Sequence, residues 1–453
     1  MEKTAPVAAL SDDSFLSILE QYQNSDKFWI AFSGGMDSSV LLHLFYTNKK
    51  KIKHDMEVVY VDHGLQAEAA DWAKFCQEQC KQYDIPFTQL EINESCPKGE
   101  SVEAWAREKR YKLIENLMEE NDVLFTGHHQ DDQVETFFLQ AFRGAGPRGL
   151  ASMPSIKKKN NTFLARPLLN FSRKELARYA EEHKLSWQDD KSNVDERYDR
   201  NYFRHKLAPV IEERWPAYRE TFSRLISHQK ETKVLLDELA EEDIKAAKIT
   251  ESSGLDVRVI KTLSHARQKN LLFVWLEQLG LQAPGSRNIE KVISDIVYSE
   301  IEKSPCVNWG DVEIRRFKNI IYAQTVMSEV DNNLEYQFQP ENSLSLFEEM
   351  LVAKEEQGKG ISKSRIKGNE LIVRFRKGGE KIKPNSSTQN KTIKKLFQER
   401  SVLPWYRDRI PLIYVNDELA AIPGFCVANK FMAEKDEASW DIQWSGFSKA
   451  IQT

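Results

Sequence analysis

Over the first 215 residues, short apolar runs alternate with amphipathic stretches. Five runs have the length and the content of β-branched or aromatic residues that strands show. They are Phe28–Phe32, Glu57–Val61, Pro86–Glu91, Val123–Thr126 and Phe163–Ala165. Between them, apolar residues recur at helical spacing, as in 67–83, 102–119 and 132–142. This alternation predicts an α/β domain over residues 1–215, with a doubly wound parallel sheet whose ligand crevice lies at the carboxyl ends of the strands.

The pattern changes after residue 215. From 216 to 330 the apolar residues keep helical spacing and few strand signals appear, so we expect a mainly helical middle domain. The stretch 331–345 is polar, contains a proline and is typical of a linker. Short alternating segments follow, such as Glu370–Arg376 and Pro411–Val415, and they predict a small α+β domain over 345–453.

Composition narrows the class of protein. The 453 residues are 41% hydrophobic and 29% charged, which is typical of a soluble globular protein with two or three domains. Five cysteines occur at irregular spacing without a CxxC pair, which argues against a disulfide framework and a zinc knuckle. The N-terminus lacks the regions of a signal peptide, and no apolar run reaches membrane-spanning length. We therefore expect a cytoplasmic protein with no membrane partner.

The first strand runs into a turn rich in glycine and serine. The turn reads Ser33-Gly34-Gly35-Met36-Asp37-Ser38-Ser39, and a helix is expected to begin at about Asp37. A strand, a glycine turn and a helix N-terminus together form a cradle for phosphate. The turn lacks the Gly-Lys-Ser/Thr of Walker A and the GxGxxG of dinucleotide sites. A carboxylate beside a bound anion is unfavourable unless a cation bridges them, so Asp37 predicts a Mg²⁺ ligand. A purely structural turn is the alternative.

The turn resembles the SGGxDS loop of the N-type ATP pyrophosphatases, whose fold is the Rossmann-like PP-loop domain. The resemblance implies that ATP binds at Ser33 to Ser39 and is cleaved between its α and β phosphates. The acceptor is then adenylated, pyrophosphate leaves, and a nucleophile displaces AMP.

Five further motifs follow in the order and spacing of one family within that superfamily. They are Val61-Asp62-His63-Gly64-Leu65, Gly127-His128-His129-Gln130-Asp131-Asp132-Gln133-Val134-Glu135-Thr136, Arg166-Pro167-Leu168-Leu169, Ser172-Arg173-Lys174-Glu175-Leu176, and Asp189-Asp190-Lys191-Ser192-Asn193 with Arg200-Asn201-Tyr202-Phe203-Arg204. Together with Lys394-Lys395-Leu396-Phe397 and Pro404-Trp405 they resemble the tRNA(Ile)-lysidine synthases. The resemblance implies ATP-dependent ligation of free L-lysine to C2 of the wobble cytidine, position 34, of an isoleucine tRNA with a CAU anticodon. The modified tRNA would read AUA in place of AUG.

The resemblance also implies site residues. The predicted catalytic residues are Asp37, Asp131, Asp132, His128 and Arg107. The predicted contacts to substrate or tRNA in the first domain are Arg110, Arg166, Asp190, Asn193, Arg200 and Arg204. Without the resemblance, the His/Asp motif also fits a two-metal cluster or a helix N-terminus favoured by its carboxylates. Arg107 and Arg110, three residues apart on a helix, also fit a solvated helix face.

A basic segment stands out near the C-terminus, although the net charge of −5 argues on average against a nucleic-acid binder. Between Arg374 and Arg409 lie eleven Lys/Arg and three Asp/Glu, with Trp405 and Tyr406 among them. A solvated amphipathic surface is one interpretation. Beside a nucleotide-activating domain we favour a surface that grips the tRNA backbone. Its predicted contacts are Lys391, Lys394, Lys395, Arg400 and Arg407, and we expect the middle domain to contribute to tRNA recognition.

Two other functions remain open from the sequence. A tRNA thiolase of the same superfamily is disfavoured by the missing CxxC, since such an enzyme requires an activated cysteine. A non-catalytic RNA- or nucleotide-binding module is disfavoured by the intact Asp37, Asp131 and Asp132. The sequence leaves the oligomeric state open, with a homodimer as one option.

Overall fold

The computed structural model describes most of the chain in nine ranges. They are residues 10–62, 69–97, 99, 102–159, 161–189, 195–249, 254–300, 304–384 and 389–451. The predicted substrate residues Asp190 and Asn193 lie outside these ranges, as does His63 of the second motif. The chain forms two compact units, residues 1–235 and 236–453, and the three-domain boundaries at 215 and 345 stay a prediction.

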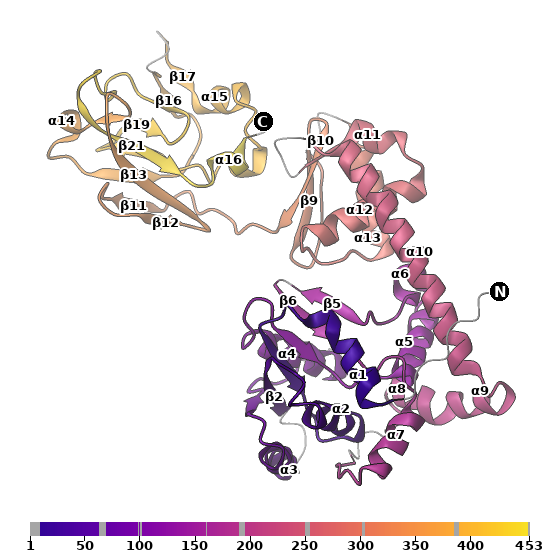
Figure 1. The fold of residues 1–453 in the computed structure, drawn as a ribbon. Helices are drawn as coiled ribbons and strands as arrows, with labels where there is room; N and C mark the ends of the chain where they lie inside the picture. The colour runs from indigo at the N-terminus through magenta and orange to yellow at the C-terminus, as the bar shows by residue number, and fades with distance from the viewer. Residues whose placement is uncertain are drawn as a thin grey trace. The chain divides into compact units, whose positions relative to one another are not determined.

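The first unit is built around a six-stranded sheet of order β3-β2-β1-β4-β6-β5 (Figure 1). Its strands are β1 Lys27–Ala31, β2 Asp55–Asp62, β3 Phe87–Glu91, β4 Val123–Phe125, β5 Ile156–Lys159 and β6 Thr162–Ala165. All neighbours pair in parallel except β5, which forms an antiparallel hairpin with β6. The five predicted strands and the doubly wound sheet are confirmed. The edge strand β5 was not predicted, because its Lys157–Lys159 run shows no apolar alternation.

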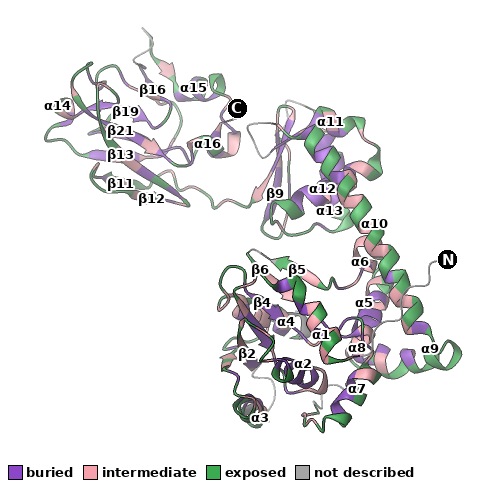
Figure 2. Ribbon diagram, viewed as in Figure 1, coloured by how far each residue is buried: buried purple, intermediate pink, exposed green. Residues whose placement is uncertain are grey.

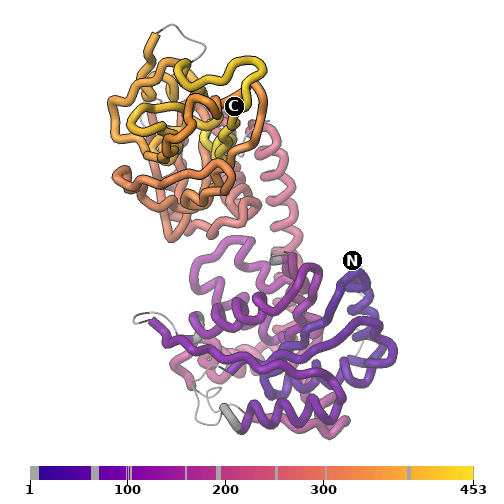
Figure 3. The backbone as a smooth tube through the Cα atoms, turned by 90° about the vertical axis from the view of Figure 1, so that its left-hand side faces the viewer, coloured from indigo at the N-terminus to yellow at the C-terminus, as the bar shows by residue number. Residues whose placement is uncertain are grey.

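Helices cover both faces of this sheet, because successive side chains of a strand point to opposite sides. Phe28 and Ile30 join one buried cluster, and Trp29 joins the other with Trp105 of α4 and Leu124. Figures 1 and 3 show helices on either side of the strands. The helices of this unit are α1 Asp12–Leu19, α2 Met36–Thr47, α3 Ala69–Gln82, α4 Val102–Glu115, α5 Gln130–Phe142, α6 Pro147–Leu150, α7 Arg173–Glu182, α8 Asp199–Tyr202 and α9 Ala208–Arg214. A 3₁₀ turn at Glu20–Tyr22 and a π-helical segment at Phe203–Leu207 complete it.

One long helix, α10 at Tyr218–Ala247, runs from the first unit into the second. After it the middle region contains α11 Val257–Thr262, α12 His265–Gln278 and α13 Ser286–Lys291 with a π-helical extension to Val297. These helices pack on a sheet of order β7-β10-β9-β8, formed by Leu255–Asp256, Ile320–Thr325, Val312–Phe317 and Cys306–Trp309. The predicted helices are confirmed, whereas the sheet was not predicted. Buried Glu313 and Arg316 interrupt the apolar pattern of β9, and this explains the omission. Most of β9 is buried (Figure 2).

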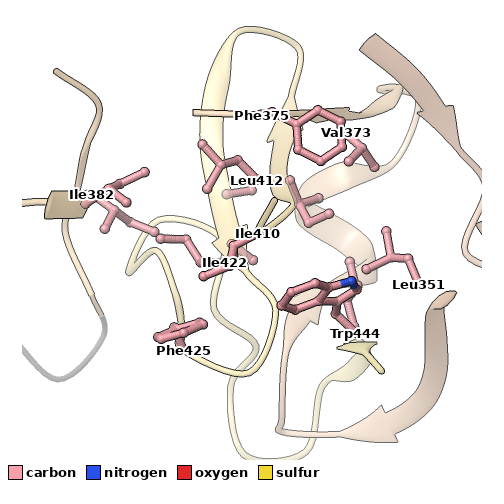
Figure 4. Packing of buried hydrophobic residues seen from close by; sticks show 14 of the residues in the cluster. Leu351, Val373, Phe375, Ile382, Ile410, Leu412, Ile422, Phe425 and Trp444 are labelled. Carbon is pink, nitrogen blue, oxygen red and sulfur yellow. The ribbon is translucent and has the colours of Figure 1, made fainter. Parts of the chain in front are cut away.

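The C-terminal region consists mainly of strands. One sheet has the order β11-β15-β18-β19-β20, from Glu335–Phe338, Leu371–Arg374, Leu412–Val415, Glu418–Ile422 and Cys426–Val427. The second has the order β12-β13-β21-β14, from Leu344–Leu346, Glu349–Gln357, Ala438–Trp444 and Ile361–Ser362. A small pair joins β16 Lys381–Ile382 to β17 Lys391–Thr392, and the helices are α14 Lys363–Ile366, α15 Ile393–Glu399 and α16 Phe447–Ala450, with a 3₁₀ turn at Pro404–Tyr406. Apolar side chains from these elements form one core (Figure 4).

The predicted linker 331–345 is wrong in part. Glu335–Phe338 pairs with β15 as an edge strand, and Phe338 is buried in the C-terminal core. The exposed residues of this strand are polar, so the segment does not stand out from a loop by composition. None of the helices in the described part of the chain combines the length and the apolarity that a membrane crossing requires.

A buried histidine joins α2 to α7 in the first unit. His43 Nδ1 lies 3.0 Å from the hydroxyl oxygen of Tyr179, and the His43 ring lies 4.9 Å from that of His183. Burial and the neighbouring His183 lower the pKa of His43 from 6.5 to about 4. Protonating the buried ring would cost solvation and would place a charge beside His183.

This pair predicts acid sensitivity of the fold. Because the pKa of His43 is lower in the folded than in the unfolded chain, its contribution is fully present above pH 6.5 and is lost as the pH falls toward 4. We expect the neutral His43 to make the free energy of unfolding about 2 kcal/mol lower at pH 5 than at pH 7.5. Urea unfolding at both pH values would measure it. His43→Gln should show a pH dependence smaller by that amount, and an unchanged dependence would contradict the assignment.

Candidate active site

The loop after β1 has a backbone that requires glycine. Gly34 adopts a φ of +78°, and a Cβ added there would lie 3.2 Å from the Sγ of Cys76 on α3. Its carbonyl oxygen accepts a hydrogen bond of 2.8 Å from the Gln188 backbone N–H. Ser38 donates from its hydroxyl to the Gly35 carbonyl oxygen over 2.9 Å and accepts from the Ser33 backbone N–H over 3.3 Å. The predicted phosphate loop is therefore held in one conformation ahead of α2.

A cavity lies at the carboxyl ends of the parallel strands, where the fold places a ligand crevice. Gly127, after β4, approaches the start of α2 so closely that an added Cβ would lie 3.0 Å from the Asp37 carbonyl oxygen. The polar residues that line the cavity come from the loop after β1, the first turn of α2, α4, the loop after β4 and the first turn of α5. They are Ser33, Asp37, Ser38, Arg110, Tyr111, Thr126, His128 and Asp132, with Gly35 and Gly127 beside them.

His129 lies buried among three carboxylates at the base of this site. Its Nε2 lies 3.5 Å from Oδ2 of Asp37 and 3.5 Å from Oδ2 of Asp132, and its Nδ1 lies 3.8 Å from Oδ2 of Asp131. Burial alone would lower the pKa of His129, but Asp132, Asp37 and Asp131 raise it to about 9. His129 is therefore a buried cation at neutral pH. From this motif the prediction selected His128, Asp131 and Asp132, and it did not include His129.

His128 has the opposite character. It lines the cavity, and its Nδ1 lies 2.9 Å from the Thr126 hydroxyl oxygen. Burial and the guanidinium groups of Arg107, Arg166 and Arg200 lower the pKa of His128 to about 3, although Asp132 opposes them. This ring is therefore neutral at pH 7.

The two adjacent aspartates have different surroundings. Asp132 lines the cavity, accepts the His129 backbone N–H over 3.0 Å at Oδ2, and lies 3.3 Å from Arg204 Nη2 at Oδ1. Burial raises its pKa, but the two histidines and Arg204 lower it to about 2. Asp131 instead accepts the Arg173 backbone N–H at the start of α7 over 2.8 Å and pairs with Arg219 Nε of α10 over 2.5 Å. Asp132 faces the cavity, whereas Asp131 connects helices.

Glu135 is a buried residue that the predicted site did not include. Its Oε1 lies 2.7 Å from Arg204 Nε, and its Oε2 lies 3.5 Å from Arg200 Nε. Burial raises the pKa of Glu135 in spite of both arginines. Two predicted tRNA contacts, Arg200 and Arg204, are thus held by a carboxylate one helical turn after Asp132. The i, i+3 spacing of Asp132 and Glu135 on α5 is a signal that could have identified this residue.

The remaining predicted arginines occupy different places. Arg110 lines the cavity, whereas Arg107 is not among the lining residues and lies with its guanidinium carbon 5.5 Å from the centre of the Tyr111 ring. Arg166 is buried, donates from Nη1 to the Pro154 carbonyl oxygen over 2.7 Å, and has a pKa lowered by burial.

The predicted C-terminal contacts also differ. Lys394, Lys395 and Arg400 are exposed, on or just after α15. Lys391 pairs with Glu399 over 2.7 Å. Arg407 is half-buried, and its Nη2 donates to the Val402 carbonyl oxygen over 2.9 Å. Arg407 is therefore engaged in the structure of its own domain.

Asp37 provides the test of a metal at the site. Its Oδ1 is buried and accepts no hydrogen bond within the described part of the chain, so a carboxylate oxygen is available to a cation. Ser39 Oγ beside it is likewise buried without such a partner. The described residues contain no group of three or more His, Cys, Asp or Glu side chains arranged to hold a metal by themselves. A cation here would therefore share its ligands with a bound phosphate.

Comparison with known proteins identifies the domains. Residues 9–211 match the PP-loop domain, residues 255–322 match the TilS substrate binding domain, and residues 371–444 match the TilS substrate C-terminal domain. The tRNA(Ile)-lysidine synthase of Coxiella burnetii is 35% identical over 95% of this chain and 96% of its own length. The proteins of the same name from Legionella pneumophila strain Paris and from Pectobacterium atrosepticum are 34% and 33% identical, over 96% and 98% of this chain and 98% and 99% of their own lengths. The chain belongs to the tRNA(Ile)-lysidine synthase family.

Proposed function

We propose that the protein ligates free L-lysine to C2 of the wobble cytidine, position 34, in an isoleucine tRNA with a CAU anticodon, at the expense of ATP. The products are the lysidine-containing tRNA, AMP and pyrophosphate, and the tRNA then reads AUA in place of AUG. The observation that carries the proposal is that residues of the phosphate loop, with Asp37, and the carboxylate of Asp132 line the same cavity. Family membership of the whole chain supports the choice of substrates.

In the first step, the loop from Ser33 to Ser39 holds the β and γ phosphates of ATP through backbone N–H groups and hydroxyls. The C2 oxygen of the cytidine attacks the α-phosphorus, and pyrophosphate leaves. Asp37, with its free Oδ1, would hold a Mg²⁺ ion that neutralises phosphate charge when bound. Arg110 lines the same cavity and places a guanidinium where negative charge accumulates.

In the second step, the ε-amine of lysine attacks C2 and AMP leaves. A cationic ammonium requires an anion to bind, and Asp132 with its low pKa supplies one in the cavity. A carboxylate with a pKa of about 2 is a weak base, so Asp132 mainly binds and orients the amine. The neutral ring of His128, which also lines the cavity, can accept a hydrogen bond from the amine, but with a pKa of about 3 it is likewise a weak base.

The alternative functions are less compatible with these features. A thiolase would require an accessible thiolate, but no cysteine is among the residues that line the described cavity. Burial raises the pKa of both Cys76 and Cys80. A module that only bound RNA would not require a buried cation that keeps Asp132 ionised.

The phosphate loop predicts the effect of Asp37→Asn. Removing the charge should lower pyrophosphate release by about 100-fold or more, because the proposed metal loses its ligand while the side-chain shape is kept. Release of pyrophosphate from ATP, with tRNA and lysine present, would measure it. Asp13→Asn, at an exposed site in α1, is the matched control and should keep full activity. Release near the normal rate in Asp37→Asn would refute this assignment.

The two aspartates of α5 should differ in their effect on lysine transfer. Asp132→Asn should keep ATP binding and lose lysine transfer, with a higher KM for lysine. Asp131→Asn should lower the unfolding free energy by about 1–3 kcal/mol, because it weakens the pair with Arg219 and the cap of α7. Urea unfolding and lysine incorporation, measured for both variants, would distinguish them. Equal loss of transfer at equal stability would contradict the different roles.

The C-terminal domain should bind tRNA through its exposed cations. The variant Lys394→Gln/Lys395→Gln/Arg400→Gln should weaken tRNA binding and flatten the slope of log K against log salt by roughly 0.7–0.9 for each lost phosphate contact. KM for tRNA should rise more than kcat falls, because these residues lie outside the reaction cavity. Arg407→Gln is the comparison: it should lower stability and leave the salt slope unchanged. A triple variant with unchanged affinity and slope would exclude these residues as tRNA contacts.

A further inference from the structure

The segment from residue 136 to residue 174 contains no acidic residue. The chain average of 69 Asp and Glu in 453 residues would place about six there. It has eight basic residues instead: Arg143, Arg148, Lys157, Lys158, Lys159, Arg166, Arg173 and Lys174. A segment of one charge sign, within a chain of net charge −5, indicates a surface that meets the opposite charge.

In the fold, this segment runs from α5 through α6, β5 and β6 to the start of α7. Arg143 is exposed at the C-terminal end of α5, and the chain continues through α6 into the edge strand β5, where Lys157 and Lys158 are exposed. The Gln133 side chain fixes the connection, because it donates to the Met153 carbonyl oxygen over 2.7 Å and accepts from the Met153 backbone N–H over 2.8 Å. The surface is therefore anchored on α5.

The same segment adjoins the reaction cavity. Gln133 is the neighbour of Asp132, which lines that cavity. Arg166 follows β6, and the Thr126 backbone N–H, on the cavity wall, donates to the Ala165 carbonyl oxygen over 3.0 Å. Hydrogen bonds therefore join this segment to α5 and to the end of β4, both of which contribute residues to the cavity lining.

The exposed side chains of this segment have the chemistry that binds RNA. Among the described residues, Arg143, Lys157 and Lys158 form no ion pair, so their charges are not neutralised by carboxylates. Phe142, directly before Arg143, is 69% exposed, although its ring lies 6.0 Å from that of Phe138. An exposed aromatic ring beside cations is the combination that binds single-stranded nucleic acid, through base stacking and phosphate contacts. Lysines on an edge strand also prevent sheet-to-sheet pairing, but that purpose does not account for Arg143 and Phe142.

We propose that Phe142, Arg143, Lys157 and Lys158 form a second RNA-binding surface, on the catalytic domain itself, which holds the RNA backbone outside the reaction cavity. This inference rests on the proposed function for the identity of the RNA. It adds a surface to the contacts predicted for the catalytic and C-terminal domains. The cations bind phosphates, and the Phe142 ring stacks on an unpaired base.

The test compares two triple variants of equal charge change in the full-length protein. Arg143→Gln/Lys157→Gln/Lys158→Gln removes the proposed surface. Lys50→Gln/Lys51→Gln/Lys53→Gln, in the exposed connection from α2 to β2, removes three charges at the amino ends of the parallel strands, the sheet edge opposite the cavity. Binding of unmodified isoleucine tRNA is measured between about 50 and 200 mM salt, where phosphate contacts dominate the salt response.

The surface variant should bind tRNA at least ten-fold more weakly, and its salt slope should flatten by about 2 to 3, as expected for three lost phosphate contacts. The control variant should bind like the unaltered protein, and ATP binding should be unchanged in both. Phe142→Ser should weaken tRNA binding without a change in slope, because stacking releases no counterions. Circular dichroism and the thermal midpoint confirm that each variant folds.

Three results would overturn the inference. The surface variant keeps its affinity and slope, or the control variant loses as much as the surface variant, or the surface variant loses binding to vesicles of anionic phospholipid while tRNA binding stays intact. The proposed function is tested separately by incorporation of labelled lysine into tRNA with the unaltered protein. Failure there would leave the comparison of tRNA affinities valid, so the two ideas can fail independently.

Discussion

The buried cation at His129 is the interaction on which the catalytic domain depends. Three carboxylates from two separate segments converge on this ring, and two of them lie 3.5 Å from Nε2. Without a positive charge between them, the carboxylates would repel one another in a region that excludes water, and a lost partner in such a cluster typically costs about 3–5 kcal/mol. With it, Asp37 is positioned at the phosphate loop, and Asp132 remains ionised where it faces the cavity. One ring therefore sets both the geometry and the charge of the site.

The same cluster attaches the outer helices to the sheet domain. Asp131 receives the first turn of α7 and the Arg219 side chain of α10, and Arg219 continues to Glu212 of α9 over 2.8 Å. On the cavity side, Arg204 joins Asp132 to Glu135. Carboxylates that are each shared by two partners therefore connect these helices to the site. The long α10, which leads to the second unit, begins from this network.

Local patterns identified the sheet and the phosphate loop, because both depend on near neighbours. Strands can be recognised from runs of apolar residues, and the presence of glycine at position 34 indicates a backbone conformation that other residues rarely adopt. The choice between His128 and His129 could not be predicted in this way. Two adjacent residues ahead of a helix point in different directions, and only the packing against Asp37, 92 residues earlier in the chain, decides which ring becomes a cation. Likewise, Arg407 is half-buried and donates a hydrogen bond to the Val402 carbonyl oxygen of its own domain. Composition alone does not reveal such a contact.

The proposed reaction requires the cavity to accommodate ligands of opposite charge. Phosphates require positive groups, and Arg110 and the backbone of the loop are the groups available to them. An ammonium requires a negative group, and Asp132 is the one available to it in the cavity. If His128 were cationic it would repel the incoming ammonium, but burial and the surrounding guanidinium groups keep it neutral. The cation of the site is instead His129, which lies behind the carboxylates and has no exposed surface. Two adjacent histidines with opposite protonation thus make one small cavity compatible with the nucleotide and the amine of the proposed reaction.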